Sequence, residues 1–262
     1  ARGETAPRQH ALTRPPGTEA EATARAIALA ALAGAPLYVA HLSCRAALDE
    51  VAAARAGGQT VFAETCPQYL FLSQADYERP DFEGARYVMS PPLREEADQE
   101  ALWRGLASGQ LQVVASDHCP FTLAEKALGK DDFSRIPNGA PGIETRMMLL
   151  WDGGVRARRI DAQRFVELTA AQPARLFGLW PRKGTIAVGS DADLVLWDPQ
   201  RELRLSAASL HMRVDYSPYE GRLLHGGPAA VVSRGELVVE RGEWKGRPGR
   251  GRFLKRRPAP AG

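Results

Sequence analysis

Short apolar runs alternate with helical patterns three times in the first half of this 262-residue chain, and this alternation constrains the fold most. The apolar runs lie at residues 37–40, 59–63 and 111–115. The helices expected before them span about 18–33, 46–56 and 98–107. Strands that alternate with helices pair in parallel and carry the helices on the faces of the sheet. The pattern therefore predicts a βα-barrel, in which active sites lie at the carboxyl ends of the strands.

The first expected helix carries signals for both of its ends. Thr18 is followed three residues later by Glu21, which predicts a capping box at the start of the helix. Gly34 follows the last alanine-rich turn and is expected to end the helix.

From Gly184 onward, the pattern changes to short strands with glycine-containing turns between them. Strands are expected at 185–188, 192–197, 229–233 and 236–240. An eight-stranded barrel takes about 250 residues of its own, yet three strand–helix units precede this β module. The sequence therefore predicts an α/β fold: the C-terminal portion of a (β/α)8 TIM-like barrel plus a small β-sandwich module. We expect the N-terminal half of the barrel upstream of Ala1, which is not a methionine.

Charge and cysteine content argue against several classes of protein. Lys and Arg number 34 and Asp and Glu 31, and a net charge of +3 is too small and too dispersed to indicate nucleic-acid binding. We read the basic stretch at 247–257 as a solvated tail. Three widely spaced cysteines form neither a disulfide framework nor a zinc knuckle, which favours the reducing cytoplasm. No apolar run approaches the roughly 20 residues of a membrane span.

Chemically useful side chains follow the expected barrel strands. His41 follows the first strand, and Asp117 follows the third. Imidazole and carboxylate groups are zinc ligands, and zinc lowers the pKa of bound water to about 7. A neighbouring carboxylate can accept the proton of that water and pass it to a leaving nitrogen. Either residue alone is also compatible with a structural role, so it is the pair in one βα array that indicates a metal site.

Six stretches of the chain make this interpretation more specific. They are YVAHLSC at 38–44, ETCPQYL at 64–70, SPPLR at 90–94, SDHCPF at 116–121, IPNG at 136–139 and RKGTIAVGSDADL at 182–194. In this order they resemble the hydantoinase/dihydropyrimidinase family, cyclic amidohydrolases of the amidohydrolase superfamily. The resemblance implies that residues 1–182 hold barrel strands six to eight with their following helices. It implies a β-sandwich part at 183–248 and a basic C-terminal tail at 249–262.

The resemblance also implies a site with two zinc ions per subunit, bridged by a carboxylated lysine that has no counterpart in this chain. On that pattern, His41 is a ligand of the more exposed metal. Asp117 is a ligand of the more buried metal and carries the proton during catalysis. The backbone groups of Ser90 and Asn138 hold the cyclic amide or imide of the substrate. His118 and Cys119 are expected to support these residues or to shape specificity, whereas His10 is expected in a surface loop.

The activity implied by the resemblance is zinc-dependent hydrolysis of dihydropyrimidines or 5-substituted hydantoins to N-carbamoyl amino acids, as in pyrimidine degradation. A metal-bound hydroxide attacks the ring carbonyl in this scheme, with Asp117 as the proton shuttle. Allantoinase or dihydroorotase activity remains an alternative, as does a non-catalytic interaction protein of the same fold. The implied partner is a small cyclic amide or imide, with no nucleic acid and no membrane. The implied assembly is a homotetramer or homodimer, and this chain by itself is expected to be inactive.

Overall fold

The computed structural model describes residues 3–258, so the last four residues of the expected basic tail lie outside the described residues. The chain separates into two compact units. One unit runs to Arg146 and includes Leu205–Arg222, and the other comprises Met147–Arg204 and the residues from Leu223 onward. These units group residues by their mutual contacts, and the domain boundaries expected at 182–183 and 248–249 stay a prediction.

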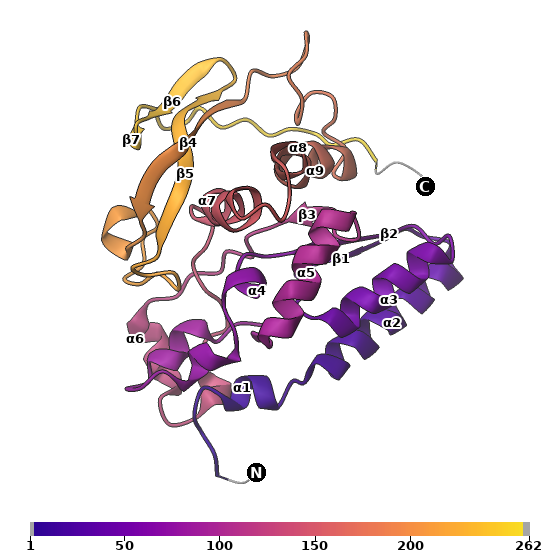
Figure 1. Cartoon of the computed structure of the whole chain (residues 1–262), viewed down its shortest axis with the longest axis vertical. Coiled ribbons are helices and arrows are strands. Elements are labelled where there is room, and N and C mark those ends of the chain that lie inside the picture. Colours follow the sequence, from indigo (N-terminus) through magenta and orange to yellow (C-terminus); the bar gives the residue numbers. More distant parts are fainter. Residues whose placement is uncertain (1–2, 259–262) are drawn as a thin grey trace. The chain divides into compact units, whose positions relative to one another are not determined.

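The first unit contains a parallel sheet of three strands (Figure 1). Its order is β1 (Leu37–Val39), β2 (Val61–Thr65), β3 (Val113–Val114). Leu37 aligns with Val61, and Thr65 aligns with Val114. All three strands run in the same direction, so their carboxyl ends meet at one edge of the sheet, as the α/β alternation predicts.

Three long helices accompany this sheet, α2 (Pro16–Ala33), α3 (Arg45–Ala56) and α5 (Glu96–Ser108). Helix α3 packs beside α2, β2 and α5, and it buries Leu48 and Val51 (Figure 1). Burial of such apolar side chains stabilises the layer by about 1.5–3 kcal/mol for each large residue.

The expected end of α2 is confirmed, but its expected start is wrong. Gly34 ends the helix with a left-handed φ of 60°, a conformation that glycine adopts without strain. The helix begins at Pro16 rather than after Thr18, because proline supplies the helical φ and needs no N–H partner at the first turn. The Thr18 hydroxyl donates to the Pro15 carbonyl, and Glu21 pairs with Arg25, so no capping box forms.

Short helices fill the long connections of the first unit. They are α1 (Gln9–Leu12), α4 (Gln68–Phe71), η1 (Gln74–Glu78), η2 (Glu83–Tyr87), α6 (Leu123–Lys126), η3 (Ala127–Gly129) and η4 (Phe133–Arg135). Most of these connections follow the carboxyl ends of strands β2 and β3, and they carry the residues of the candidate site.

The segment Leu205–Arg222, which includes η7 (Ala207–Ser209), also belongs to the first unit. Tyr216 and Tyr219 are buried there. The Asp215 carboxylate accepts a hydrogen bond from the Leu123 amide at the start of α6. This distant segment therefore helps to fix the loop that follows β3.

The second unit contains an antiparallel sheet in the order β4 (Leu194–Arg204), β5 (Leu223–Ser233), β6 (Glu236–Glu240), β7 (Glu243–Trp244). Its helical segments are α7 (Arg146–Leu150) from Met147 onward, η5 (Trp151–Arg156), α8 (Ala162–Val166), η6 (Glu167–Ala171) and α9 (Gln172–Leu176). Trp151, Phe165 and Trp197 form an aromatic cluster with ring centroids 5.2–5.6 Å apart. Gly226 is required beside it, because a Cβ there would lie 2.2 Å from the Trp151 ring.

The strand expected at 185–188 does not form. Asp191 forms an ion pair with Lys183, and its amide donates to the Arg182 carbonyl, which closes the segment as a loop. Ile186 and Val188 are exposed to solvent in this loop. The apolar alternation at 185–188 therefore did not suffice to predict a strand.

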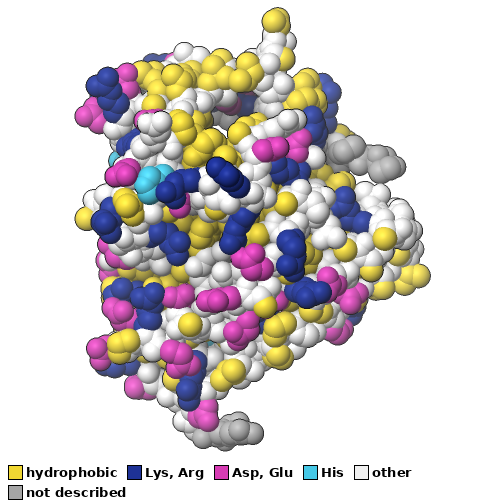
Figure 2. Space-filling view, viewed as in Figure 1, with side chains coloured by type: hydrophobic (Ala, Val, Ile, Leu, Met, Phe, Trp, Pro, Cys, Tyr) yellow, Lys and Arg dark blue, Asp and Glu magenta, His cyan; other side chains and the backbone are white. Residues whose placement is uncertain are grey.

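Charged side chains of both signs are interspersed on the face of the molecule shown in Figure 2. Among residues 3–258, none of the helices combines the length and the apolar composition that a membrane span requires.

Candidate functional site

The residues expected to bind metal lie at the carboxyl edge of the parallel sheet. His41 is two residues beyond the end of β1, and Asp117 is three residues beyond the end of β3. Strand β2, which pairs with both β1 and β3, ends between them at Thr65. The two side chains are thus carried by strand ends that lie on the same side of one sheet.

Both residues also have an unusual backbone conformation. His41 has a φ of 40° and Asp117 a φ of 46°, in the left-handed region that residues other than glycine rarely adopt. Such conformations cost about 1–3 kcal/mol each and concentrate at ligand-binding and active sites. The surrounding contacts must hold both turns, and at His41 the amide donates to Glu64 Oε1 at 3.4 Å.

The imidazole of His41 differs from the other four histidine rings. The rings of His10, His118, His211 and His225 have polar partners: the Met89 carbonyl, the amides of Gly142 and Ile143, Glu144, and Asp152 with Glu202. Within the described residues, the His41 ring has no hydrogen-bond or ion-pair partner. Its nitrogen lone pair is therefore available to a ligand that the chain itself does not supply.

The carboxylate of Asp117 is similarly unengaged. The residue is exposed, and its carboxylate has no hydrogen-bond or ion-pair partner in the described part of the chain. Burial raises the pKa of the Cys66 thiol, and the negative charges of Glu64 and Asp117 raise it further. Asp117 can therefore bind a cation or accept a proton without first breaking an internal contact.

The described residues contain no group of three or more His, Cys, Asp or Glu side chains that could hold a metal ion. A catalytic zinc ion takes three protein ligands in most enzymes. His41 and Asp117 fit the chemistry of a zinc site, but they make up a partial ligand set.

The two positions expected to bind substrate lie in contact with each other. The Ser90 hydroxyl donates to Asn138 Oδ1 at 3.0 Å, although 48 residues separate them in the sequence. Asn138 Nδ2 in turn donates to the Ile136 carbonyl at 3.1 Å. Both residues are exposed. The Ser90 and Asn138 loops thus present their polar groups to solvent at one place.

His118 and Cys119 connect the β3 end to the Asn138 loop. His118 Nδ1 accepts from the Gly142 amide at 3.1 Å and the Ile143 amide at 3.3 Å, and burial lowers its pKa. The Cys119 amide donates to the Ala140 carbonyl at 3.2 Å. Because Nδ1 is the acceptor, the neutral ring carries its proton on Nε2. The His118 ring thus holds the segment at Gly142 beside Asp117, whereas the Cys119 contact is made by its backbone.

His10 is buried, so the expectation of a surface loop is wrong. Its side chain is 1% exposed, and Nε2 donates to the Met89 carbonyl at 2.7 Å. Burial lowers the pKa of this imidazole to about 4, so the ring is neutral at pH 7. The partner lies 79 residues away, and nothing in the local sequence distinguishes this histidine from a surface one.

The buried ion pair of Arg94 and Glu19 supports two loops, the one that follows β1 and the one that contains Ser90. Arg94 donates to Glu19 at 2.9 Å, to the Ser43 hydroxyl at 3.0 Å and to the Arg14 carbonyl at 2.6 Å. The Ser43 amide donates to the same Glu19 carboxylate at 2.8 Å. This network links the Ser43 turn, two residues after His41, to the segment that begins at Ser90.

Gly139 gives the Asn138 loop a conformation that a side chain would prevent. Its φ is +146°, and a Cβ there would lie 2.4 Å from the Cys119 carbonyl oxygen. We expect Gly139→Ala to lower the free energy of unfolding by about 2 kcal/mol or more, since it adds a clash to backbone strain. Gly58→Ala is the control, because Gly58 also has a positive φ but open space around it. Equal losses in the two variants, measured by chemical denaturation, would show that the contact with Cys119 has no effect.

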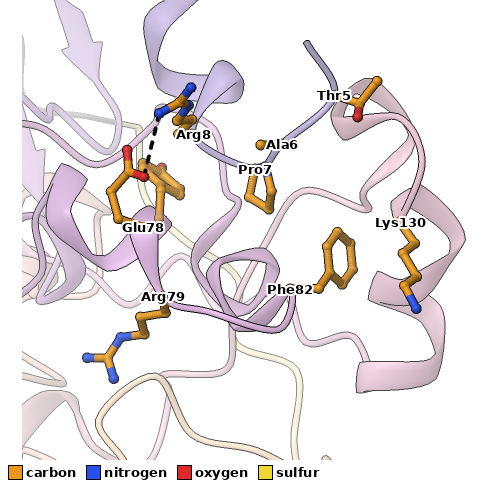
Figure 3. Close-up of a pocket in the computed structure, with 9 residues that line it drawn as sticks. Thr5, Ala6, Pro7, Arg8, Glu78, Arg79, Phe82 and Lys130 are labelled. Carbon is orange, nitrogen blue, oxygen red and sulfur yellow. Dashed lines mark ion pairs between the residues drawn. The ribbon is translucent and has the colours of Figure 1, made fainter.

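A surface pocket of about 410 Å³ lies elsewhere in the first unit (Figure 3). Phe82, Arg79 and Lys130 are among its lining residues, and Arg8 and Glu78 form an ion pair across one side at 3.8 Å. None of the residues expected at the site lines this pocket, so it is separate from the strand ends.

Comparisons with known proteins show which family the chain resembles. The model of the family described as "Amidohydrolase family" matches residues 20–238. The D-hydantoinase of Rhizobium radiobacter is 52% identical over 258 residues, which are 98% of this chain and 56% of that protein. The structure of dihydropyrimidinase from Brevibacillus agri NCHU1002 is 53% identical with a TM-score of 0.96, and the match covers 97% of this chain and 55% of that one.

A more distant structure is also similar. The L-hydantoinase (dihydropyrimidinase) from Arthrobacter aurescens is 35% identical with a TM-score of 0.86, over 92% of this chain and 53% of that one. The chain thus spans just over half the length of these relatives.

Proposed function

The chain belongs to the amidohydrolase family, and from this premise we propose that it is the C-terminal part of a cyclic amidohydrolase. The longer polypeptide, called the complete protein below, hydrolyses a cyclic amide bond in dihydropyrimidines or 5-substituted hydantoins. Its products are N-carbamoyl amino acids. The names of the relatives, D-hydantoinase and dihydropyrimidinase, support this class of substrate.

One observation carries the proposal. The free imidazole of His41 and the free carboxylate of Asp117 follow parallel strands of one sheet at the same edge, each on a turn with positive φ. The other four histidines use their ring nitrogens within the chain. The pair instead leaves its polar atoms open at the edge where barrel enzymes have their active sites.

The reaction consumes one water molecule. The water oxygen forms a bond to the amide carbon, the ring carbon–nitrogen bond breaks, and the leaving nitrogen gains a proton. The Asp117 carboxylate accepts a proton from the attacking water and returns it to the leaving nitrogen. The backbone groups at Ser90 and Asn138 hold the N–H and C=O edge of the ring, and the hydrogen bond between these residues keeps them adjacent.

The chemistry proposed for this site requires zinc. When bound, zinc would polarise the amide carbonyl and lower the pKa of water towards neutrality. His41 and Asp117 would hold different zinc ions, and the carboxylated lysine and the remaining ligands would come from the upstream part of the complete protein. This chain by itself therefore lacks a full ligand set for either ion and is inactive.

A substrate panel tests the proposal. The complete protein, purified with zinc, is assayed for ring opening of dihydrouracil, hydantoin, a 5-substituted hydantoin, allantoin and dihydroorotate. Turnover of the first three well above that of the last two is expected. Preference for allantoin or dihydroorotate would reassign the substrate class. A folded, zinc-free protein without activity on any of them would instead support a non-catalytic interaction protein.

We also propose that the complete protein works in the cytoplasm, which the number and spacing of the cysteines favour. We further propose that it is a homotetramer or homodimer, as the family resemblance implies. Light scattering coupled to size-exclusion chromatography measures the assembly directly, and a monomer would contradict it.

A further inference from the structure

Lys126 is a buried lysine at the end of α6 with a full set of backbone partners. Its side chain is 1% exposed, and Nζ donates to the carbonyls of Val88 at 2.8 Å, Pro137 at 2.6 Å and Gly139 at 2.7 Å. An ammonium group has three N–H donors, so every donor of Lys126 is used. Removing a buried cation from water is unfavourable unless its donors are satisfied, as they are here.

The partners of Lys126 flank the two positions proposed to hold the substrate. Val88 lies two residues before Ser90, and Pro137 and Gly139 lie on either side of Asn138. One ammonium group thus binds the backbones of both loops. The Gly139 amide adds a direct bond to the Val88 carbonyl at 3.0 Å.

The structure assigns Lys126 as a positioning residue for substrate binding: it fixes the backbones of Ser90 and Asn138 at the spacing that a cyclic amide requires. This inference rests on the proposed function, in which the ring is held by backbone groups at these two positions. Backbone groups cannot be removed by substitution, so Lys126 gives experimental access to them.

Lys126 acts on binding rather than on the chemical step in this account. Its three hydrogen bonds go to the Val88, Pro137 and Gly139 carbonyls, and none goes to His41 or Asp117. A small displacement of substrate-holding groups can reduce activity by up to about 100-fold. The expected signature is therefore a raised KM with kcat and metal content preserved.

The test uses the complete protein with dihydrouracil as substrate. Lys126→Met has a side chain of similar length without donors, and its KM is expected to rise by about 10- to 100-fold. Its kcat is expected to stay within about threefold of the parent, with unchanged zinc content, since no group of the reaction is altered. Lys130→Met is the matched control, because Lys130 is an exposed lysine four residues along the chain, and its KM should not change.

A second variant covers the case in which Lys126→Met does not fold. Lys126→Gln keeps two N–H donors, and its KM is expected between those of the parent and of Lys126→Met. An unchanged KM in whichever of the two variants folds, with or without a lower melting temperature, would make Lys126 purely structural and overturn the inference. So would a fall in kcat at constant KM. If the parent enzyme itself fails to open dihydrouracil or hydantoin, the proposed function fails instead.

Discussion

Replacing Asp117 by asparagine is expected to lower kcat of the complete protein by about 10³-fold or more, without unfolding it. The amide keeps the shape of the carboxylate but cannot accept the proton that the leaving nitrogen needs. The fold should survive, because Asp117 is exposed and its carboxylate has no partner among residues 3–258. Initial rates on dihydrouracil and hydantoin with zinc supplied, together with thermal unfolding, measure both effects.

A control for this change is Asp131→Asn. Asp131 is also exposed and has no side-chain partner in the described part of the chain, but it lies outside the strand ends. Its activity is expected to equal that of the parent. Activity of Asp117→Asn within about tenfold of the parent would remove Asp117 from the proton-transfer role.

Arg94→Met is expected to lower the free energy of unfolding by about 3–5 kcal/mol. The substitution leaves the Glu19 carboxylate without its cation, in a place where the side chains of Glu19 and Arg94 are 14% and 3% exposed. It also removes the donors to the Ser43 hydroxyl and the Arg14 carbonyl. Chemical denaturation of the complete protein, monitored by a spectroscopic signal from the barrel, measures the loss.

Arg25→Met is the matched control on helix α2. Arg25 pairs with Glu21 at 2.9 Å, but these side chains are 65% and 62% exposed, so the pair contributes about 0.5 kcal/mol or less. Adding Glu19→Gln to Arg94→Met should restore part of the stability, because the uncompensated charge is gone. Equal losses in Arg94→Met and Arg25→Met would mean that burial does not strengthen the Arg94 network.

Local sequence signals were enough to predict the sheet and its neighbouring helices. The apolar runs at 37–40 and 111–115 and the helix end at Gly34 depend on neighbours within a few residues. The structure confirms the helix end and places strands β1 and β3 within these runs. The position of His41 and Asp117 at one edge follows from the parallel pairing alone. The order of strands and helices along the chain is therefore sufficient to predict this part of the candidate site.

Contacts between distant segments could not be predicted in this way. Lys126 looks like a surface lysine in its own sequence, and its burial depends on carbonyls 11, 13 and 38 residues away. His10 and Arg94 are buried for the same reason, through partners 79 and 75 residues away. Lys and Arg are rarely fully buried, so residue type argued against the burial of Lys126 and Arg94.

The start of α2 shows a different limit. Thr18 and Glu21 satisfy the capping-box pattern, but the pattern competes with Pro16, which already has the dihedral angle of a first helical turn. The Glu21 carboxylate instead accepts a hydrogen bond from Arg25, one turn later in the helix. Two valid local rules therefore conflicted, and the backbone restriction of proline outweighed the side-chain hydrogen bond.

Bound zinc in the complete protein tests the central claim most directly, because that claim makes His41 a ligand of one metal ion. Elemental analysis is done on the parent, on His41→Ala and on the control His211→Ala. The exposed ring of His211 pairs with Glu144 at 2.7 Å, outside the strand ends. We predict about two zinc ions per subunit in the parent and in His211→Ala, and about one in His41→Ala. An unchanged zinc content in His41→Ala, or a folded and active parent without bound metal, would contradict the account.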